Sequence, residues 1–270
     1  METPVIEKSN RKIEVLSDLE ALSLRAASIF VSASKNSIAA KKRFAVAISG
    51  GSTPRRLYTL LGSETYRDQV DWQHVHFFWA DERCVPKDDE ASNFRTAFET
   101  LFSKIALPEK NIHRIKGEEA PDKAARDYEE EIRRFFGGSE RPGFDLIILG
   151  MGEDGHTASL FPGSKSLEET VRLAVPVYLE KPGKNRITLT LPVLNNADQI
   201  LFLVTGPSKA AVLSEILGEG EKKKRFPAGL IRPAHGNTTW LIDQEAAGKL
   251  TQTQLIYCHC QIRDSETSSE

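Results

Sequence analysis

The sequence has little that would tie it to a membrane, to nucleic acid or to an oxidising compartment. Its three cysteines, Cys84, Cys258 and Cys260, are too few for a disulfide framework. No apolar stretch approaches the ~20 residues of a membrane span, and residues 1–10 lack the apolar core of a signal peptide. A net charge of -2 argues against general nucleic-acid binding, which needs a basic surface. We therefore expect a cytoplasmic protein with neither a membrane nor nucleic acid as a partner.

Cofactor motifs are also absent. The glycine-rich stretch at residues 49–54 is not followed by the Gly-Lys-Ser/Thr of a Walker loop, and it does not have the G-x-G-x-x-G spacing of a dinucleotide site. Cys258-His-Cys260 has no second ligand pair that would complete a metal site. The sequence therefore predicts no cofactor and no metal.

What the sequence does contain is an alternation of short apolar strands and amphipathic helices. The composition, 40% hydrophobic and 27% charged, is ordinary for a globular protein. Strands are expected at 13–16, 44–48, 75–80, 112–115, 146–149, 171–178, 186–191, 200–204 and 239–242. Helices are expected at 18–40, 54–61, 92–102, 122–136 and 210–217, with loop or short helix at 164–169.

This alternation predicts a doubly wound α/β fold, with a mostly parallel, Rossmann-like sheet and helices on both faces. We find no internal repeat and no obvious linker, so residues 1–270 are interpreted as a single domain. Its core is expected at about 11–250. Residues 1–10 are expected to form a loose arm, and the tail at 251–270 is expected to be frayed.

The stretch at residues 145–163 is the strongest candidate for a functional site. The apolar run from Leu146 to Leu149 is typical of a strand buried inside a parallel sheet. It is followed by three glycines within six residues, with Asp154 and His156 at the tip of the turn. Ligands of open α/β sheets bind outside the carboxyl ends of the strands. The pattern therefore places a titratable imidazole and a carboxylate where such folds carry out chemistry.

A second glycine loop follows the strand predicted at residues 44–48. Thr53 is a candidate N-cap and Pro54 suits the first position of the next helix. A strand, a glycine loop and a helix N-terminus together form an arrangement that can hold a phosphate on free backbone N–H groups. A tight turn without a ligand is the alternative.

Three cations are candidates for additional phosphate contacts. Arg83 follows the strand predicted at 75–80, and its guanidinium can bind a phosphate through two parallel hydrogen bonds. A solvated loop at residues 81–83 is the lesser alternative. Arg186 opens a predicted strand, and Lys209 lies in the first turn of a predicted helix. Lys209 is either solvated or reaches back toward an anion.

Together these motifs resemble the 6-phosphogluconolactonase family, within the wider superfamily of glucosamine-6-phosphate isomerases and deaminases. The resemblance spans residues ~40 to ~242. The residues that carry it are Ser49-Gly-Gly-Ser-Thr-Pro54, Asp81-Glu-Arg-Cys-Val-Pro86, Ser92-Asn93, Gly150-Met-Gly-Glu-Asp-Gly-His-Thr-Ala-Ser-Leu-Phe-Pro-Gly163, Arg186-Ile-Thr-Leu-Thr190, Gly206-Pro-Ser-Lys209 and Pro227-Ala228. It implies hydrolysis of 6-phospho-D-glucono-1,5-lactone to 6-phosphogluconate, the second step of the oxidative pentose phosphate pathway, without cofactor or metal.

The residue chemistry agrees with this reaction. Ester hydrolysis at neutral pH needs a base that takes a proton from water, and we assign His156. Asp154 is expected to hold or polarise the imidazole, with Asp81 or Glu82 as the next candidates for the base. The substrate phosphate is expected to contact Gly50, Gly51, Ser52, Thr53, Arg83, Arg186 and Lys209. We expect a monomer or a weak homodimer.

Two alternatives remain from other functional classes. In the deaminase and isomerase branch of the superfamily, a glutamate occupies the position of Phe161, and its carboxylate serves ring opening and proton transfer. Phe161 cannot ionise, which favours the lactonase. A sugar-phosphate sensor without turnover could dispense with the histidine, which is retained here.

Overall fold

The computed structural model describes residues 11–180, 185–218 and 220–251. The predicted arm at 1–10, the turn at 181–184, the tail after Thr251 and the Cys258–Cys260 segment lie outside the described residues. In the described ranges no helix is long and apolar enough to cross a membrane.

A six-stranded sheet forms the centre of the molecule, and every neighbouring pair of strands in it is parallel. The order is β1-β9-β8-β5-β2-β3. The strands are β1 (Arg11–Leu16), β2 (Phe44–Ile48), β3 (Val75–Trp79), β5 (Leu146–Leu149), β8 (Gln199–Val204) and β9 (Asn237–Asp243). The mostly parallel α/β fold predicted from the sequence is therefore confirmed.

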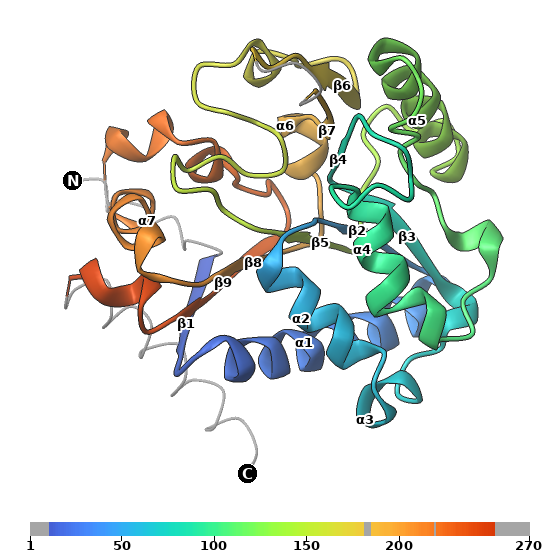
Figure 1. Ribbon diagram of the computed structural model, residues 1–270, viewed down its shortest axis with the longest axis horizontal. Coiled ribbons are helices and arrows are strands. Elements are labelled where there is room, and N and C mark those ends of the chain that lie inside the picture. The colour runs from blue at the N-terminus through green and yellow to red at the C-terminus, as the bar shows by residue number, and fades with distance from the viewer. Residues whose placement is uncertain (1–10, 181–184, 219, 252–270) are drawn as a thin grey trace, which may run out of the picture.

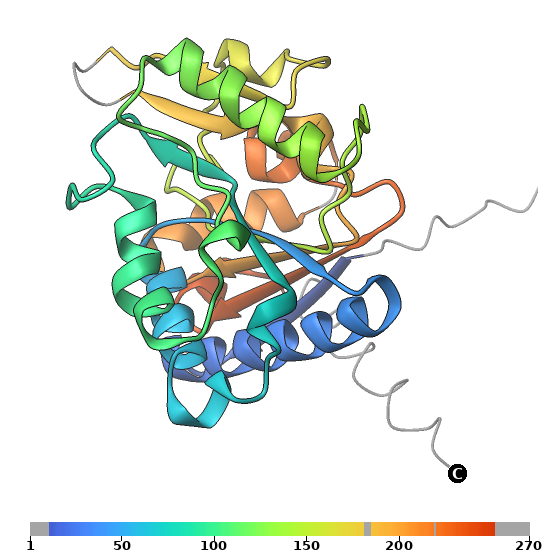
Figure 2. The ribbon, with the colours of Figure 1, turned by 90° about the vertical axis from the view of Figure 1, so that its right-hand side faces the viewer.

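Helices lie on both sides of this sheet. α1 (Leu19–Lys41) and α2 (Ser52–Leu61) cover one side, and α7 (Ala210–Leu217) lies on the other (Figures 1 and 2). Asp18 caps α1 as predicted, accepting a hydrogen bond from the Ala21 N–H at 2.8 Å. The remaining α-helices are α3 (Glu64–Arg67), α4 (Asn93–Thr100), α5 (Pro121–Phe135) and α6 (Leu191–Leu194).

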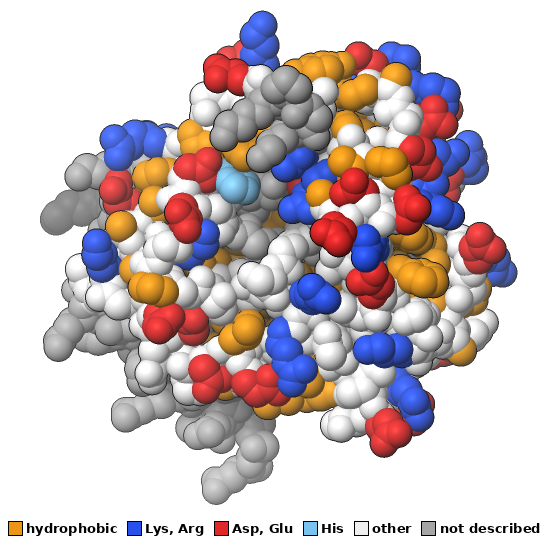
Figure 3. All heavy atoms as spheres, in the orientation of Figure 1, with side chains coloured by type: hydrophobic (Ala, Val, Ile, Leu, Met, Phe, Trp, Pro, Cys, Tyr) orange, Lys and Arg blue, Asp and Glu red, His pale blue; other side chains and the backbone are white. Residues whose placement is uncertain are grey.

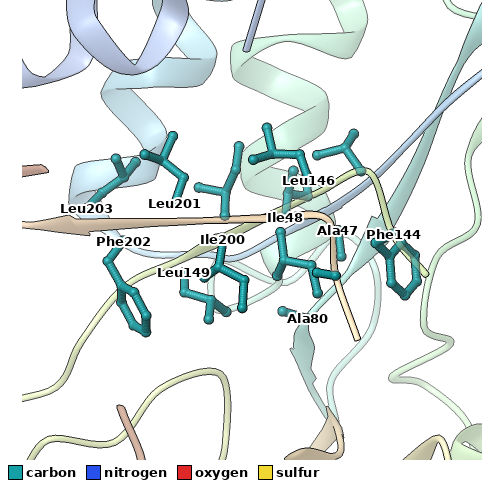
Figure 4. Close-up of a cluster of buried hydrophobic side chains, with 14 of the residues drawn as sticks. Ala47, Ile48, Ala80, Phe144, Leu146, Leu149, Ile200, Leu201, Phe202 and Leu203 are labelled. Carbon is teal, nitrogen blue, oxygen red and sulfur yellow. The ribbon is translucent and has the colours of Figure 1, made fainter. Parts of the chain in front are cut away.

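The core lies on both faces of the sheet, because the central strands are apolar at successive positions rather than at alternate ones. In β8, Leu201 and Leu203 point to one side and Phe202 to the other (Figure 4). The Phe202 ring stacks on Trp240 of the neighbouring β9, with centroids 3.8 Å apart. The continuous apolar runs in the sequence therefore correspond to strands covered on both faces.

A second, three-stranded antiparallel sheet was not predicted as a separate sheet, although two of its strands lie within the strands expected at 171–178 and 186–191. Its order is β4-β7-β6, formed by β4 (Asp81–Arg83), β7 (Arg186–Leu189) and β6 (Ala174–Val177), and α5 packs against its outer side (Figure 2). Residues 81–83 are a strand rather than a solvated loop. The charged composition of residues 81–83 does not indicate a strand. They form one because they pair with residues 186–188, about 100 positions away in the chain.

Two smaller predictions are wrong. The strand expected at 112–115 is reduced to a single bridge between Ile112 and Phe77, because the chain leaves β3 after one backbone hydrogen bond and turns. Helix α2 begins at Ser52, with Gly51 rather than Thr53 at its N-cap. Gly51 has φ 113°, a conformation that L side chains rarely adopt, so glycine suits this position.

The order of the strands creates one special place in the sheet. The connection from β2 leads to β3 at one edge, whereas the chain from β5 leads to β8 and β9 in the opposite direction. Adjacent strands β2 and β5 therefore mark the switch point, where a crevice opens outside the carboxyl ends of the strands. The two glycine loops singled out in the sequence follow these two strands.

Candidate active site

The loops after β2 and β5 face one cavity of about 510 Å³. Its wall includes all the predicted site residues except Asp154, namely Gly50, Gly51, Ser52, Thr53, Arg83, His156, Arg186 and Lys209. Asp154 lies beside His156 and contacts its ring. The structure thus brings together residues that are up to 159 positions apart in the chain, from Gly50 to Lys209.

The loop after β2 is shaped by close contact with α4. A Cβ built on Gly50 would lie 1.8 Å from Oδ1 of Asn93, so only glycine fits against this side chain. On its other side, the Thr53 hydroxyl hydrogen-bonds the Thr205 hydroxyl at 2.8 Å. The loop leads directly into the N-terminus of α2, where backbone N–H groups and the helix dipole favour an anion.

The loop after β5 is held in shape by hydrogen bonds between its own residues. The Gly152 N–H donates to the His156 carbonyl at 2.9 Å, and the Thr157 hydroxyl donates to the Gly150 carbonyl at 2.8 Å. Gly155, with φ 77°, packs so closely on Phe226 that a Cβ would lie 2.7 Å from its ring. These contacts hold His156 on a rigid turn rather than on a free loop.

Asp154 orients the imidazole of His156. Its Oδ1 lies 2.6 Å from Nδ1 and also accepts the His156 N–H at 3.1 Å. Partial burial alone would raise the pKa of Asp154, but the two hydrogen bonds from His156 outweigh it and lower this pKa. An ionised Asp154 favours the tautomer with the proton on Nδ1. Nε2 is then the basic nitrogen.

Two further residues enclose the imidazole. The Phe161 ring lies against it with centroids 4.6 Å apart, and a Cβ on Gly152 would lie 2.1 Å from Nδ1. Phe161 also lines the cavity. Phe161, the residue that favoured the lactonase over the deaminase in the sequence analysis, is therefore an apolar ring that packs on the histidine.

Three cations, Arg83, Arg186 and Lys209, line the cavity. Arg83 and Arg186 are directly opposite each other in the β4–β7 pair. Burial, and next the charge of Arg83, lower the pKa of Arg186. Like charges placed opposite each other destabilise a sheet, so an anion bound between them would relieve this repulsion. Lys209 lies 3.7 Å from Glu153 in the His156 loop. In the view of Figure 3, a histidine lies at the surface of the molecule, with Lys and Arg side chains on both sides of it.

The wall also contains Asp81, which the sequence analysis gave only as a reserve base, and residues that were assigned no role in the site. Asp81 Oδ2 accepts a hydrogen bond from the Ser159 hydroxyl at 2.6 Å, and the Asn93 amide donates to the Asp81 carbonyl at 2.8 Å. Thr205 follows β8 and lines the same cavity. The rule that identified His156, polar residues just after a buried strand, applies equally to Thr205 and would have found it.

Glu82, considered above as a reserve base, faces away from the cavity. Only 2% of its surface is exposed, and it contacts the N-terminus of α4. Burial raises the pKa of Glu82 to about 7, although hydrogen bonds from the Asn93, Phe94 and Arg83 N–H groups act in the opposite direction. Asp81, by contrast, reaches the cavity.

Throughout the described part of the chain, no three His, Cys, Asp or Glu side chains are grouped in a way that could hold a metal ion. The groups that the site offers are an imidazole, its carboxylate and several cations. An imidazole beside a helix N-terminus, which favours anions, can activate water against an anionic substrate.

The fold and the site together define an α/β protein whose cavity, at the switch point of a parallel sheet, combines a His–Asp pair with a glycine loop at a helix N-terminus. The family model for glucosamine-6-phosphate isomerases and 6-phosphogluconolactonases matches residues 17–240. The chain belongs to this family.

Individual relatives agree with the match. A 6-phosphogluconolactonase from Haemophilus influenzae is 40% identical over 74% of this chain and 85% of its own. One from Synechocystis is 38% identical over 88% of this chain and 98% of its own. Among solved structures, the 6-phosphogluconolactonase from Trypanosoma cruzi has a TM-score of 0.79 and 31% identity, and the match covers 89% of this chain and 97% of that one.

Proposed function

We propose that His156 deprotonates the water molecule that opens the ring of a phosphorylated sugar lactone. The reaction of this enzyme is hydrolysis of 6-phosphogluconolactone, a step of the pentose phosphate pathway, since relatives that match most of the chain carry that name. The observation that supports His156 as the base is its 2.6 Å contact with Asp154 at the wall of the cavity.

The mechanism begins with the imidazole neutral and its Nδ1 proton directed at Asp154. Nε2 takes a proton from water, and the oxygen of that water bonds to the lactone carbonyl carbon. The resulting tetrahedral oxyanion collapses, and the bond from the carbonyl carbon to the ring oxygen breaks. The imidazolium then returns its proton to the ring oxygen, which becomes a hydroxyl. Asp154 stabilises the transient imidazolium, as a carboxylate does in other His-based sites.

The substrate phosphate is held at a distance from this centre. Arg83 and Arg186 form a cationic pair on one wall, and the loop of Gly50 to Thr53 presents the N-terminus of α2. Lys209 adds a third cation. Binding energy from the phosphate thereby orients the lactone carbonyl toward His156.

The substrate partner is thus a sugar-phosphate lactone. We extend the proposal to a cytoplasmic enzyme that acts as a monomer or weak homodimer, independently of nucleic acid and membranes. The near-neutral charge of the whole sequence supports independence of nucleic acid.

The assignment of the base is tested with His156→Ala. We expect a loss of about 10²–10⁴-fold in kcat, the range of general acid–base catalysis. Affinity for 6-phosphogluconate should change little, because the phosphate contacts lie elsewhere. Lactone turnover is measured on freshly generated substrate with spontaneous hydrolysis subtracted, and product affinity is measured by calorimetry. A variant with near-normal kcat would show that another group activates the water, and Asp81 would then be the next residue to replace.

A further inference from the structure

Glu82 is a buried carboxylate surrounded by hydrogen-bond donors. Oε1 accepts the Arg83 N–H at 2.7 Å and the Asn93 N–H at 2.8 Å. Oε2 accepts the Phe94 N–H at 2.8 Å and the Ser92 hydroxyl at 3.2 Å. Three of these groups belong to the first residues of α4 or its N-cap, where backbone donors lack intrahelical partners. A carboxylate at this end of a helix is also favoured by the helix dipole.

We propose that Glu82 is the positioning residue of the phosphate subsite, holding Arg83 and the Gly50 loop in their places by joining β4 to α4. The inference rests on the proposed function, which assigns phosphate binding to Arg83 and to the Gly50 loop. Glu82 itself does not reach the cavity, so it acts through other residues.

The connection to Arg83 runs through the chain just before α4. The Arg83 guanidinium donates a hydrogen bond through Nη1 to the carbonyl of Ala91, which precedes the N-cap Ser92. Glu82 fixes Ser92 from one side and the Arg83 backbone from the other. If α4 moved away from β4, the carbonyl that orients the guanidinium would move with it.

The connection to the Gly50 loop runs through Asn93, the first residue of α4. Its backbone N–H is bound by Glu82, and its side chain is 2% exposed. The amide Nδ2 donates to the Asp81 carbonyl, which leaves Oδ1 directed at Gly50. Because a Cβ on Gly50 would lie only 1.8 Å from this oxygen, the loop rests directly on Asn93. Glu82 thus helps to position both parts of the phosphate subsite, which are Arg83 and the Gly50 loop.

The chemistry of Glu82 can be changed without changing its shape. Glu82→Gln replaces one oxygen by an NH2 group, which would face at least one N–H donor whichever way the amide is turned. A donor facing a donor at a buried site forces the groups apart. The helix N-terminus should therefore move relative to β4, while His156 and Asp154, on the loop after β5, keep their own contacts.

The readout is the preference for a phosphorylated over an unphosphorylated lactone. We compare kcat/KM on 6-phosphogluconolactone and on gluconolactone for the wild-type chain, Glu82→Gln, Arg83→Ala and the double variant. Assays at about pH 8 keep Glu82 ionised, since burial gives it a pKa of about 7. Glu99→Gln serves as the matched control, because Glu99 lies on the same helix but pairs with Arg95 at the surface.

Glu82→Gln should lower the preference ratio about 10- to 100-fold, as displacement of a binding group by part of an ångström does. It should change kcat/KM on gluconolactone by less than about threefold. In the Arg83→Ala background the same substitution should lower the ratio by clearly less than in the wild-type background, because the two residues act together. Glu99→Gln should leave the ratio unchanged.

Three outcomes contradict the proposal itself, and a fourth contradicts the phosphate assignment on which it rests. Equal losses on both lactones would make Glu82 a general stability residue, as would full additivity with Arg83→Ala. An unchanged ratio in Glu82→Gln, with a lowered one in Arg83→Ala, would sink this inference and leave the phosphate role of Arg83 standing. An unchanged ratio in Arg83→Ala would instead refute the phosphate assignment itself. If Glu82→Gln does not fold, Ser92→Ala removes one donor to Glu82 and is judged by the same ratio, with a smaller expected decrease.

Discussion

At the scale of single residues, three neighbours together fix the position of the His156 imidazole. Asp154 binds Nδ1 of His156 at 2.6 Å, Phe161 packs on the ring face, and Gly152 lies so close that it has no room for a side chain. None of these contacts contributes a proton to the reaction. In the proposed mechanism, their effect is to keep Nε2 in the orientation that serves an attacking water.

Gly152→Ala should therefore impair catalysis while leaving binding nearly intact. The new Cβ would lie 2.1 Å from Nδ1 of His156 and 2.6 Å from Oδ1 of Asp154, so the ring must move. We expect kcat to fall by about 10- to 100-fold, with KM changing less than about threefold.

Gly150→Ala is the matched control, since a Cβ at Gly150, in the same loop, meets no atom within 4 Å. It should retain near-normal kcat. Steady-state kinetics and thermal melts of both variants provide the comparison. Similar kinetic losses in both alanine variants would show that the loop, rather than the space beside His156, limits the reaction.

At the scale of elements, a pair of histidines, His76 and His113, lies at the β3 edge of the sheet and does not line the cavity. On β3, His76 Nδ1 lies 3.1 Å from Nε2 of His113, whose Nδ1 contacts Glu131 of α5 at 2.7 Å. Burial, followed by the charges of His113, Arg43, Lys110 and His74, lowers the pKa of His76 to about 4. Burial also lowers the pKa of His113, although Glu131 opposes it. The native state therefore favours both rings neutral.

This arrangement predicts a loss of stability in acid. In the unfolded chain a histidine takes up a proton near pH 6.5, whereas native His76 does so only near pH 4. Between these values the unfolded state binds more protons, so the free energy of unfolding should fall as the pH falls. The contribution of His76 is present above about pH 6.5 and is lost progressively toward pH 4.

The measurement compares the wild-type chain with His76→Gln by urea unfolding at several pH values. Glu82, whose raised pKa acts with the opposite sign between its unfolded value and about 7, is common to both proteins and cancels in the difference. The stability of the wild type relative to the variant should decline on acidification. A difference that stays constant from about pH 7 to pH 4.5 would contradict the assigned shift.

At the scale of the whole molecule, the two edges of the sheet have different tasks. The carboxyl edge carries the cavity. At the opposite edge, Lys41 at the end of α1 bridges Asp145, just before β5, and Asp198, just before β8, at 2.7 Å each. Burial alone would lower the pKa of Lys41, but its bonds to the two aspartates raise it. Asp145 is 4% exposed and also accepts the Ala45 N–H.

Lys41→Met should reduce stability without reducing activity. It leaves the buried Asp145 carboxylate without its cation, and Lys41 is itself half exposed, so we expect a loss of about 1–2 kcal/mol. For a chain of this size the corresponding fall in Tm is about 2–8 °C. The exposed Lys35 on the same helix provides the control, Lys35→Met, which should melt like the wild type.

Calorimetry and lactone turnover on the same samples test this separation. The Lys41→Met protein should retain its kcat below its melting range, because Lys41 bonds to Asp145 and Asp198, and neither aspartate lines the cavity. A marked fall in kcat of the folded variant would mean that the two edges of the sheet are coupled.

Much of the site was predictable because short-range patterns carry it. The buried run of Leu146 to Leu149, followed by glycines and His156, placed the imidazole at the edge of a parallel sheet, and the structure has it there. Gly50 was recognised in the same way. Such predictions succeed because a strand covered on both faces must be apolar throughout, and the residues just after it must lie at the ligand edge.

The sequence by itself therefore determined the class of fold, the two glycine loops and the residues gathered around one cavity. Only the tertiary structure decided what holds them. The β4–β7–β6 sheet, the contact of Asn93 with Gly50 and the inward direction of Glu82 depend on pairing between segments distant in the chain. Charge patterns cannot reveal these features, because a buried carboxylate satisfied by backbone donors and a solvated one have the same letter in the sequence.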